Sequence, residues 1–238
     1  LKLKKLGKRV IFDSHEDVPK QTIAKPYLGP RRLAVIARFL SSFERYVCSR
    51  LDGVIAATPP IRDKFIDINL NSIDINNFPM PGELDGDVPW DRREAEISYV
   101  GWLTEERGVR ELVTAMEYVS LDVRLNLVGN FDRPDFENEV KSLPGWQRVN
   151  ELGFLDRRGV RETLDRSLIG MVTLRPLINY LDSQPVKMFE YMSAGIPVIA
   201  SDFPLWQDVI EGNDCGLCVD PMKPESIAKA IDYLVGTP

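Results

Sequence analysis

Several features that mark particular classes of protein are scarce or missing in this sequence. The 238 residues include one histidine and three cysteines, and three cysteines do not make a disulfide framework. No apolar run approaches the roughly 18 residues of a membrane-spanning helix, and no secretory signal is visible. The formal net charge of −6 argues against a nucleic-acid-binding protein, which needs a basic face. We therefore expect a cytoplasmic protein that binds no nucleic acid.

The residues that are present have the composition of a globular protein. Hydrophobic residues make up 44% of the chain and charged residues 28%, and its length suffices for one or two domains with a real core. Apolar segments typical of strands alternate with amphipathic segments typical of helices along the whole chain. This alternation predicts an α/β fold with parallel sheets.

A run rich in proline, glycine and acidic residues, 78–90, predicts a boundary between two domains, 1–90 and 91–238. Before it, the pattern predicts strands at 8–14, 53–57 and 72–76, with helices at 30–51 and 59–67. This first part is too short for a complete domain.

After the boundary the alternation continues for a whole doubly wound domain. Strands are expected at 96–101, 123–128, 148–153, 168–174, 196–200 and 216–219. Helices are expected at about 108–119, 134–142, 157–166, 185–194, 204–211 and 224–235. The right-handed crossover rule places a ligand at the edge formed by the carboxyl ends of the strands.

The segment 180–202 is the most informative part of the chain. It predicts a loop, a helix with Pro185 at its first position, a turn at Gly195 and the strand 196–200. One of the three polar residues before Pro185 would cap the helix.

Lys187 and Glu190 fall on one face of that helix, in the wrong order for a simple stabilising pair. A cation in the first turn opposes the helix dipole, but it makes sense if an anion docks there, since helix N-termini bind phosphate. Glu190 lies among apolar residues and needs donors, which two sugar hydroxyls would supply. The alternative is an ordinary helix with a solvated ion pair.

This segment resembles the nucleotide-binding signature of family 4 glycosyltransferases, retaining enzymes of the GT-B fold. That signature has two acidic residues separated by seven others, a spacing that Asp182 and Glu190 share. The resemblance implies that Glu190 holds the ribose hydroxyls and that Asp182, in place of the usual Glu, contacts the donor sugar. It covers nearly all of the chain. It implies a complete C-terminal Rossmann-like domain and a partial N-terminal one, so that the chain would be a fragment.

His15 matches, by position, a histidine that the family places against the donor sugar and the diphosphate. It follows the predicted strand 8–14 and would therefore face the cleft. The acidic residues Asp13, Glu16 and Asp17 would raise its pKa by their charge. An ordinary exposed histidine is one alternative. A metal site is another, although a single histidine supports it weakly.

A glycine-rich turn from Gly101 to Gly108 follows the first strand of the second domain and allows close approach of the backbone to phosphate. The resemblance implies two cations in this turn. Trp102 takes the place of the first and Arg107 that of the second, so Arg107 would bind the diphosphate. Thr104 would cap the next helix or contact phosphate. The alternative is a solvated Arg107.

Further donor-binding residues are expected at other strand ends. Asn130 follows the next strand, and the run 152–156 resembles the stretch whose backbone contacts the base. Arg175 would replace the missing cation or orient the donor sugar, and Ser183 and Gln184 line the same loop. Each of these is equally an ordinary loop residue.

The resemblance implies transfer of a sugar from a nucleoside diphosphate donor to a glycan or lipid-linked acceptor with retained configuration. The enzyme would be a hexosyltransferase, as in surface polysaccharide biosynthesis, without a metal or cofactor. The alternatives are a nucleotide-sugar epimerase of the same fold and a module that binds nucleotide sugars without turnover. Since the first domain is incomplete, we expect this chain alone to bind nucleoside diphosphate weakly and to transfer no sugar.

Two other motifs have ordinary explanations. The start of the chain, 1–9, carries five basic residues that could form a peripheral contact with the inner membrane face, but the end of a helix leading into a strand explains it too. Cys215 and Cys218 have redox spacing, yet they fall in a turn and a short strand rather than at a helix N-terminus that would lower a thiol pKa. We expect no redox or metal role for them.

Overall fold

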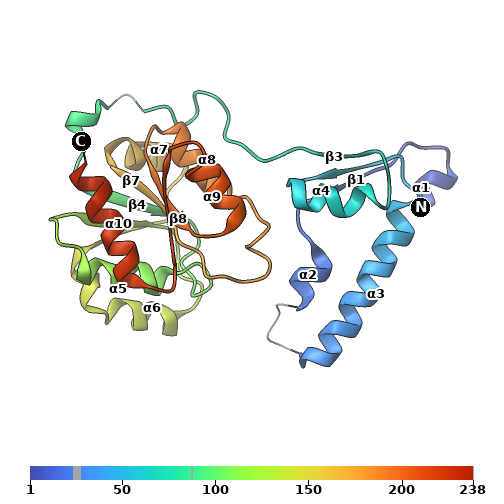
Figure 1. Cartoon of the computed structure of the whole chain (residues 1–238), viewed down its shortest axis with the longest axis horizontal. Helices are drawn as coiled ribbons and strands as arrows, with labels where there is room; N and C mark the ends of the chain where they lie inside the picture. The colour runs from blue at the N-terminus through green and yellow to red at the C-terminus, as the bar shows by residue number, and fades with distance from the viewer. Residues whose placement is uncertain (24–27, 87, 238) are drawn as a thin grey trace. The chain divides into compact units, whose positions relative to one another are not determined.

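The chain folds into two compact units. The computed structural model describes residues 1–23, 28–86 and 88–237. The first unit comprises Leu1–Asn77 and Leu177–Gln184, and the second Phe78–Pro176 and Pro185–Pro238. Figure 1 draws both units and labels their helices and many of their strands.

The first unit is built on a parallel sheet of three strands in the order β1-β2-β3. The strands are β1 (Ile11–Ser14), β2 (Gly53–Ala56) and β3 (Ser72–Asp74), and the helices are α1 (Lys2–Lys5), α2 (Val18–Ile23), α3 (Pro30–Cys48) and α4 (Pro59–Ile66). Val54, Ile61 and Phe65 pack in its core. Helix α2 is absent from the sequence-based prediction because six residues are too few to show a helical period of apolar side chains.

The second unit is a doubly wound sheet of six parallel strands in the order β6-β5-β4-β7-β8-β9. They are β4 (Glu96–Val100), β5 (Arg124–Val128), β6 (Val149–Gly153), β7 (Ile169–Val172), β8 (Val198–Ser201) and β9 (Gly216–Val219). From β4 to β6 the strands are added on one side of β4, and from β7 to β9 they are added on its other side. The neighbouring strands β4 and β7 therefore form the switch point at which such sheets bind ligands. The predicted α/β fold with parallel sheets is therefore confirmed.

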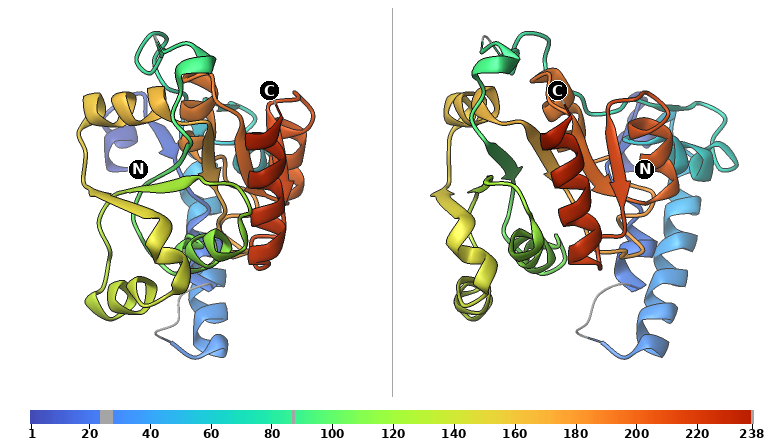
Figure 2. Two further views of the ribbon diagram at one scale, coloured as in Figure 1. Left: turned by 90° about the vertical axis from the view of Figure 1, so that its left-hand side faces the viewer. Right: turned by 60° about the vertical axis from the view of Figure 1, so that its left-hand side comes forward.

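Helices cover both faces of this sheet (Figures 1 and 2). They are α5 (Val109–Tyr118), α6 (Pro134–Lys141), α7 (Arg157–Arg166), α8 (Val186–Ser193), α9 (Pro204–Ile210) and α10 (Pro224–Gly236), with short 3-10 turns η1 (Trp90–Arg92) and η2 (Pro144–Arg148). Right-handed crossovers place α5 and α6 on one face, where α10 packs against α5, and α7, α8 and α9 on the other. The central strands β7 and β8 are fully buried because both faces are covered, whereas the edge strands β6 and β9 are partly exposed.

The connecting segment, defined as residues 78–86, belongs to the second unit. The ring of Phe78 packs edge-to-face on Phe189 with 4.6 Å between centroids, and the Ser193 hydroxyl donates to the Asp85 carboxylate at 3.4 Å. Leu84 is fully buried. The second unit therefore begins at Phe78, earlier than the boundary expected after residue 90, because these side chains contact α8.

No helix in the described residues is long and apolar enough to cross a membrane. The same residues contain no group of three or more histidine, cysteine, aspartate or glutamate side chains that could hold a metal ion.

The three cysteines are free thiols, of which Cys48 is buried and Cys215 and Cys218 are partly buried. Burial raises the pKa of Cys218 to about 12 and that of Cys48 to about 11, and it also raises the pKa of Cys215. At pH 8 only about one Cys218 side chain in ten thousand is then a thiolate, the form that reacts.

We expect the folded protein to react with a chromogenic disulfide reagent at pH 8 at least about 100-fold more slowly than free cysteine. Unfolding in guanidinium should expose all three thiols to rapid reaction and serves as the control. Reaction of the folded protein at the rate of the free amino acid would contradict the raised pKa values of these thiols.

Candidate nucleotide site

A cavity of about 300 Å³ opens at the carboxyl ends of β4, β5 and β6 in the second unit. It is lined by Val100, Gly101, Trp102, Val128, Gly129, Asn130, Phe154, Leu155, Arg157, Val160 and Lys187. The lining is mostly apolar, with two aromatic side chains and two cations. Such a combination suits a small ligand with a flat apolar part and an anionic part.

Glycine at 129 shapes the mouth of this cavity. Its φ of +145° lies in a region that other residues rarely adopt, and a methyl group there would lie 1.8 Å from the Gly101 carbonyl oxygen. The amide of Gly101 donates to Val128, and that of Gly129 donates to Gly153 at 2.8 Å. The turns after β4 and β5 can approach each other only because this position has no side chain.

Glu190 lies on α8 and is only 4% exposed. Its Oε1 accepts a hydrogen bond from Arg157 Nη1 at 2.7 Å, and its Oε2 accepts one from Lys187 Nζ at 2.6 Å. Both cations also line the cavity. A carboxylate has about four lone-pair sites, so each oxygen keeps capacity for one further donor. The pair of oxygens could therefore accept two hydroxyl groups side by side.

The start of α8 differs in detail from the expectation. Pro185 is the N-cap residue, the helix begins at Val186, and no side chain caps it. The Ser183 hydroxyl donates instead to the Tyr180 carbonyl at 2.9 Å. Lys187 therefore stands in the first turn, as the sequence predicted, and Glu190 supplies the negative charge that offsets its unfavourable position in the dipole.

Arg157 was missed by sequence reasoning. It is the first residue of α7, whose N-cap Asp156 accepts from the Gly159 amide at 2.8 Å. Its guanidinium also binds Glu83, through Nε at 2.6 Å and Nη2 at 2.9 Å. A cation at the start of a helix is the same signal that singled out Lys187, so Arg157 could have been noticed. Its partner Glu83 could not, because the contact joins residues far apart in the chain.

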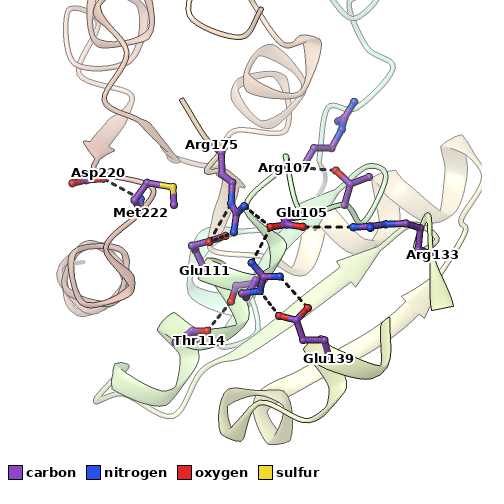
Figure 3. A network of polar contacts seen from close by, with 11 residues as sticks. Glu105, Arg107, Glu111, Thr114, Arg133, Glu139, Arg175, Asp220 and Met222 are labelled. Atoms are coloured by element: carbon purple, nitrogen blue, oxygen red, sulfur yellow. Dashed lines mark hydrogen bonds and ion pairs between the residues drawn. The ribbon is translucent and has the colours of Figure 1, made fainter. Parts of the chain in front are cut away.

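A second polar network surrounds Arg175, which follows β7 (Figure 3). Arg175 donates to Glu105 at 2.7 Å and to Glu111 at 2.5 Å. Arg110 also binds Glu105, at 3.1 Å, and pairs with Glu139. The hydrogen bond from Arg175 lowers the pKa of Glu105. Arg175 is thus engaged by two carboxylates instead of being held ready for an anion.

Arg107 and Thr104 occupy the turn after β4. The Thr104 hydroxyl accepts the Arg107 amide at 3.3 Å, while the Arg107 side chain points away from the network around Arg175 (Figure 3). A methyl group built on Gly101 would lie 3.3 Å from Arg107 Nη1, so the guanidinium lies over the glycine-rich turn. Among the described residues, Arg107 forms no ion pair.

The remaining predicted residues belong to the first unit. His15 follows β1, its side chain is 63% exposed, and its Nε2 lies 3.2 Å from Asp13 Oδ2. Asp182 pairs with Lys20. The side-chain oxygen of Gln184 is buried without a hydrogen-bond partner among the described residues. The structure thus brings Gly101, Asn130 and Lys187 together at the cavity with Glu190 directly behind, whereas His15, Asp182, Ser183 and Gln184 are part of a separate unit.

Comparison with known proteins assigns the chain to a family. Residues 94–237, more than half of the chain, match the model of the family described as glycosyl transferases group 1. The chain therefore belongs to this family. An uncharacterized glycosyltransferase of Methanocaldococcus jannaschii is 24% identical over 236 residues, which cover 93% of this chain and 56% of that protein.

Solved glycosyltransferase structures share the fold. HepE of Anabaena, solved in complex with UDP, superposes with a TM-score of 0.75 and 15% identity over 98% of this chain and 64% of that one. Sucrose-phosphate synthase of Thermosynechococcus elongatus superposes with a TM-score of 0.71 and 21% identity over 96% of this chain and 59% of that one. These matches confirm the GT-B type of α/β fold. The chain spans less than two thirds of the length of each of these relatives.

Proposed function

We propose that this chain forms the donor-binding part of a retaining glycosyltransferase, which moves a hexose from a nucleoside diphosphate to a glycan or lipid-linked acceptor. A role in surface polysaccharide biosynthesis, on the cytoplasmic side of the membrane, remains our prediction. One observation carries the proposal. Glu190 is buried behind a cavity at the switch-point edge, accepts a hydrogen bond from each of two cations, and has one lone pair left on each oxygen.

The cavity divides into parts that match a nucleoside diphosphate. Trp102 and Phe154 supply aromatic surface for a base. Glu190 does not line the cavity but is bonded to the lining residues Arg157 and Lys187, and it would accept the two ribose hydroxyls. Lys187 at the cavity and Arg107 over the glycine-rich turn would neutralise the diphosphate. The amide groups of this turn can approach phosphate closely because Gly101 and Gly129 carry no side chains.

The chemistry follows from these charges. Sugar transfer with a diphosphate leaving group develops negative charge on the phosphate oxygens, and fixed cations stabilise it without reorganising. His15 and Asp182 are proposed to contact the donor sugar, with Asp182 replacing the usual glutamate. The donor is a substrate, and the proposal requires no metal or cofactor.

A module that binds nucleotide sugars without turnover is the second candidate. One observation favours it, because the family's first phosphate cation is replaced by Trp102 and the nearby Arg175 is engaged by Glu105 and Glu111. Release of free sugar or transfer to an acceptor by the chain would exclude this candidate.

Titration calorimetry of the chain against UDP, GDP and ADP tests the proposal. We expect one of them to bind with a dissociation constant of about 10 to 100 μM, or −5.5 to −7 kcal/mol, and its nucleoside monophosphate to bind more weakly. UDP is the first choice, since the Anabaena structure was solved with it. Arg158→Ala, which removes an arginine that is 85% exposed, is the control and should bind normally. Binding of none of the three by a folded chain would refute the proposal.

A further inference from the structure

Arg157 lies between two carboxylates that come from distant parts of the second unit. One is Glu190 on α8, and the other is Glu83 in the connecting segment. Three of its N–H groups donate to these oxygens, at 2.6, 2.9 and 2.7 Å. The hydrogen bonds that Arg157 donates to Glu83 and Glu190 raise the pKa of Arg157, so its charge is permanent.

Glu83 fixes the plane of the guanidinium. Its two oxygens accept two parallel hydrogen bonds from Arg157, a geometry that a single point charge cannot provide. Glu83 is itself held, because its Oε2 accepts the Met80 amide at 3.2 Å. The segment around it is anchored by the buried Leu84 and by Phe78 against Phe189. The guanidinium of Arg157 is therefore held in a fixed orientation while its Nη1 donates to Glu190.

The contact between Glu83 and Arg157 becomes important when a diphosphate occupies the cavity. This inference rests on the function proposed above. Lys187 lines the cavity and would turn its ammonium toward phosphate. Glu190, at 4% exposure, would then keep one counter-charge, which is Arg157.

We propose that Arg157, clamped by Glu83, is the positioning residue that keeps Glu190 aimed at the two ribose hydroxyls after phosphate has engaged Lys187. The clamp would then set the preference for ribonucleotides over 2′-deoxyribonucleotides. It places a residue of the connecting segment, Glu83, in the nucleotide specificity of the chain without any contact to the nucleotide.

The test measures the dissociation constants of UDP, GDP and ADP and of their 2′-deoxy forms by calorimetry. The unmodified chain should prefer the ribose form of its nucleotide by about tenfold or more, the value of one hydrogen bond to a charged group. Glu83→Gln and Arg157→Gln should lower this ratio below about threefold. The exposed neighbour Arg158→Ala should leave the ratio unchanged, and circular dichroism monitors the fold of each variant.

The outcomes separate the two proposals. If the unmodified chain binds none of the six nucleotides, or binds ribose and deoxyribose forms equally, the assignment of Glu190 fails and the clamp fails with it. If the unmodified chain discriminates and Glu83→Gln discriminates as well as it does, the clamp alone is refuted. Glu83 is partly exposed, so this variant decides the question even if Arg157→Gln does not fold.

Discussion

Glu190→Ala is expected to abolish measurable binding of nucleoside diphosphate. The substitution removes both acceptors proposed for the ribose hydroxyls, and each hydrogen bond to a charged group contributes about 1.5 to 3 kcal/mol. It also removes the carboxylate that accepts hydrogen bonds from both Arg157 and Lys187 and offsets the repulsion between these two cations. Together these effects predict a loss of affinity of at least about 100-fold.

Calorimetry of the variant against the nucleotide that binds the unmodified chain measures this loss. Glu162→Ala is the matched control, because Glu162 is 62% exposed on α7 and pairs only with Arg158 among the interactions seen in the described residues. Circular dichroism must show that the variant is folded, since a buried position is changed. An unchanged dissociation constant in a folded Glu190→Ala chain would exclude Glu190 from the nucleotide site.

Gly129→Ala is expected to lower the free energy of unfolding of the second unit by more than about 4 kcal/mol. The new methyl group would overlap the Gly101 carbonyl oxygen, 1.8 Å away, and the φ of +145° would be strained as well. Separating the two turns to relieve the overlap would also open the hydrogen bonds that join β4, β5 and β6 at this edge. The midpoint of thermal unfolding should fall by about 10 °C or more.

The control for this variant separates strain from overlap. Gly153 also has a positive φ, +65°, at the end of the neighbouring strand, but a methyl group there has no atom within 4 Å. Gly153→Ala should therefore cost only about 1 to 2 kcal/mol, the price of the left-handed backbone alone. Thermal denaturation followed at 222 nm compares the two. Equal midpoints for the two variants would show that the turns are not in close contact.

Local patterns predicted much of this molecule. The alternation of apolar strands and amphipathic helices was enough for the parallel sheets and the doubly wound second unit, since each element carries its own period. Lys187 was recognised because a cation in a first helical turn contradicts the dipole, and Glu190 because a carboxylate among apolar residues needs partners. In the structure the two are bonded at 2.6 Å, with Glu190 almost fully buried.

The features that sequence reasoning missed depend on contacts between distant residues. Glu83 lies in a proline- and glycine-rich run, and Arg157 lies on the helix α7. Nothing in the local sequence around either residue indicates that the two are in contact. Arg175 follows β7 in the position of a ligand-binding cation. It is nevertheless bound by Glu105 from the loop after β4 and by Glu111 from α5. Composition also placed a domain boundary at 78–90, although Leu84 within this run is fully buried.

The packing of the connecting segment determines where related enzymes can be recombined. In a chimaera that exchanges the second unit for that of a relative, a junction placed by composition would fall near residue 90. Such a hybrid would take residues 78–86 from one parent and α8 from the other, so Glu83 would meet a foreign Arg157 and Leu84 a foreign pocket. A junction before Phe78 keeps the connecting segment, α7 and α8 from the same parent, so their mutual contacts are exchanged intact.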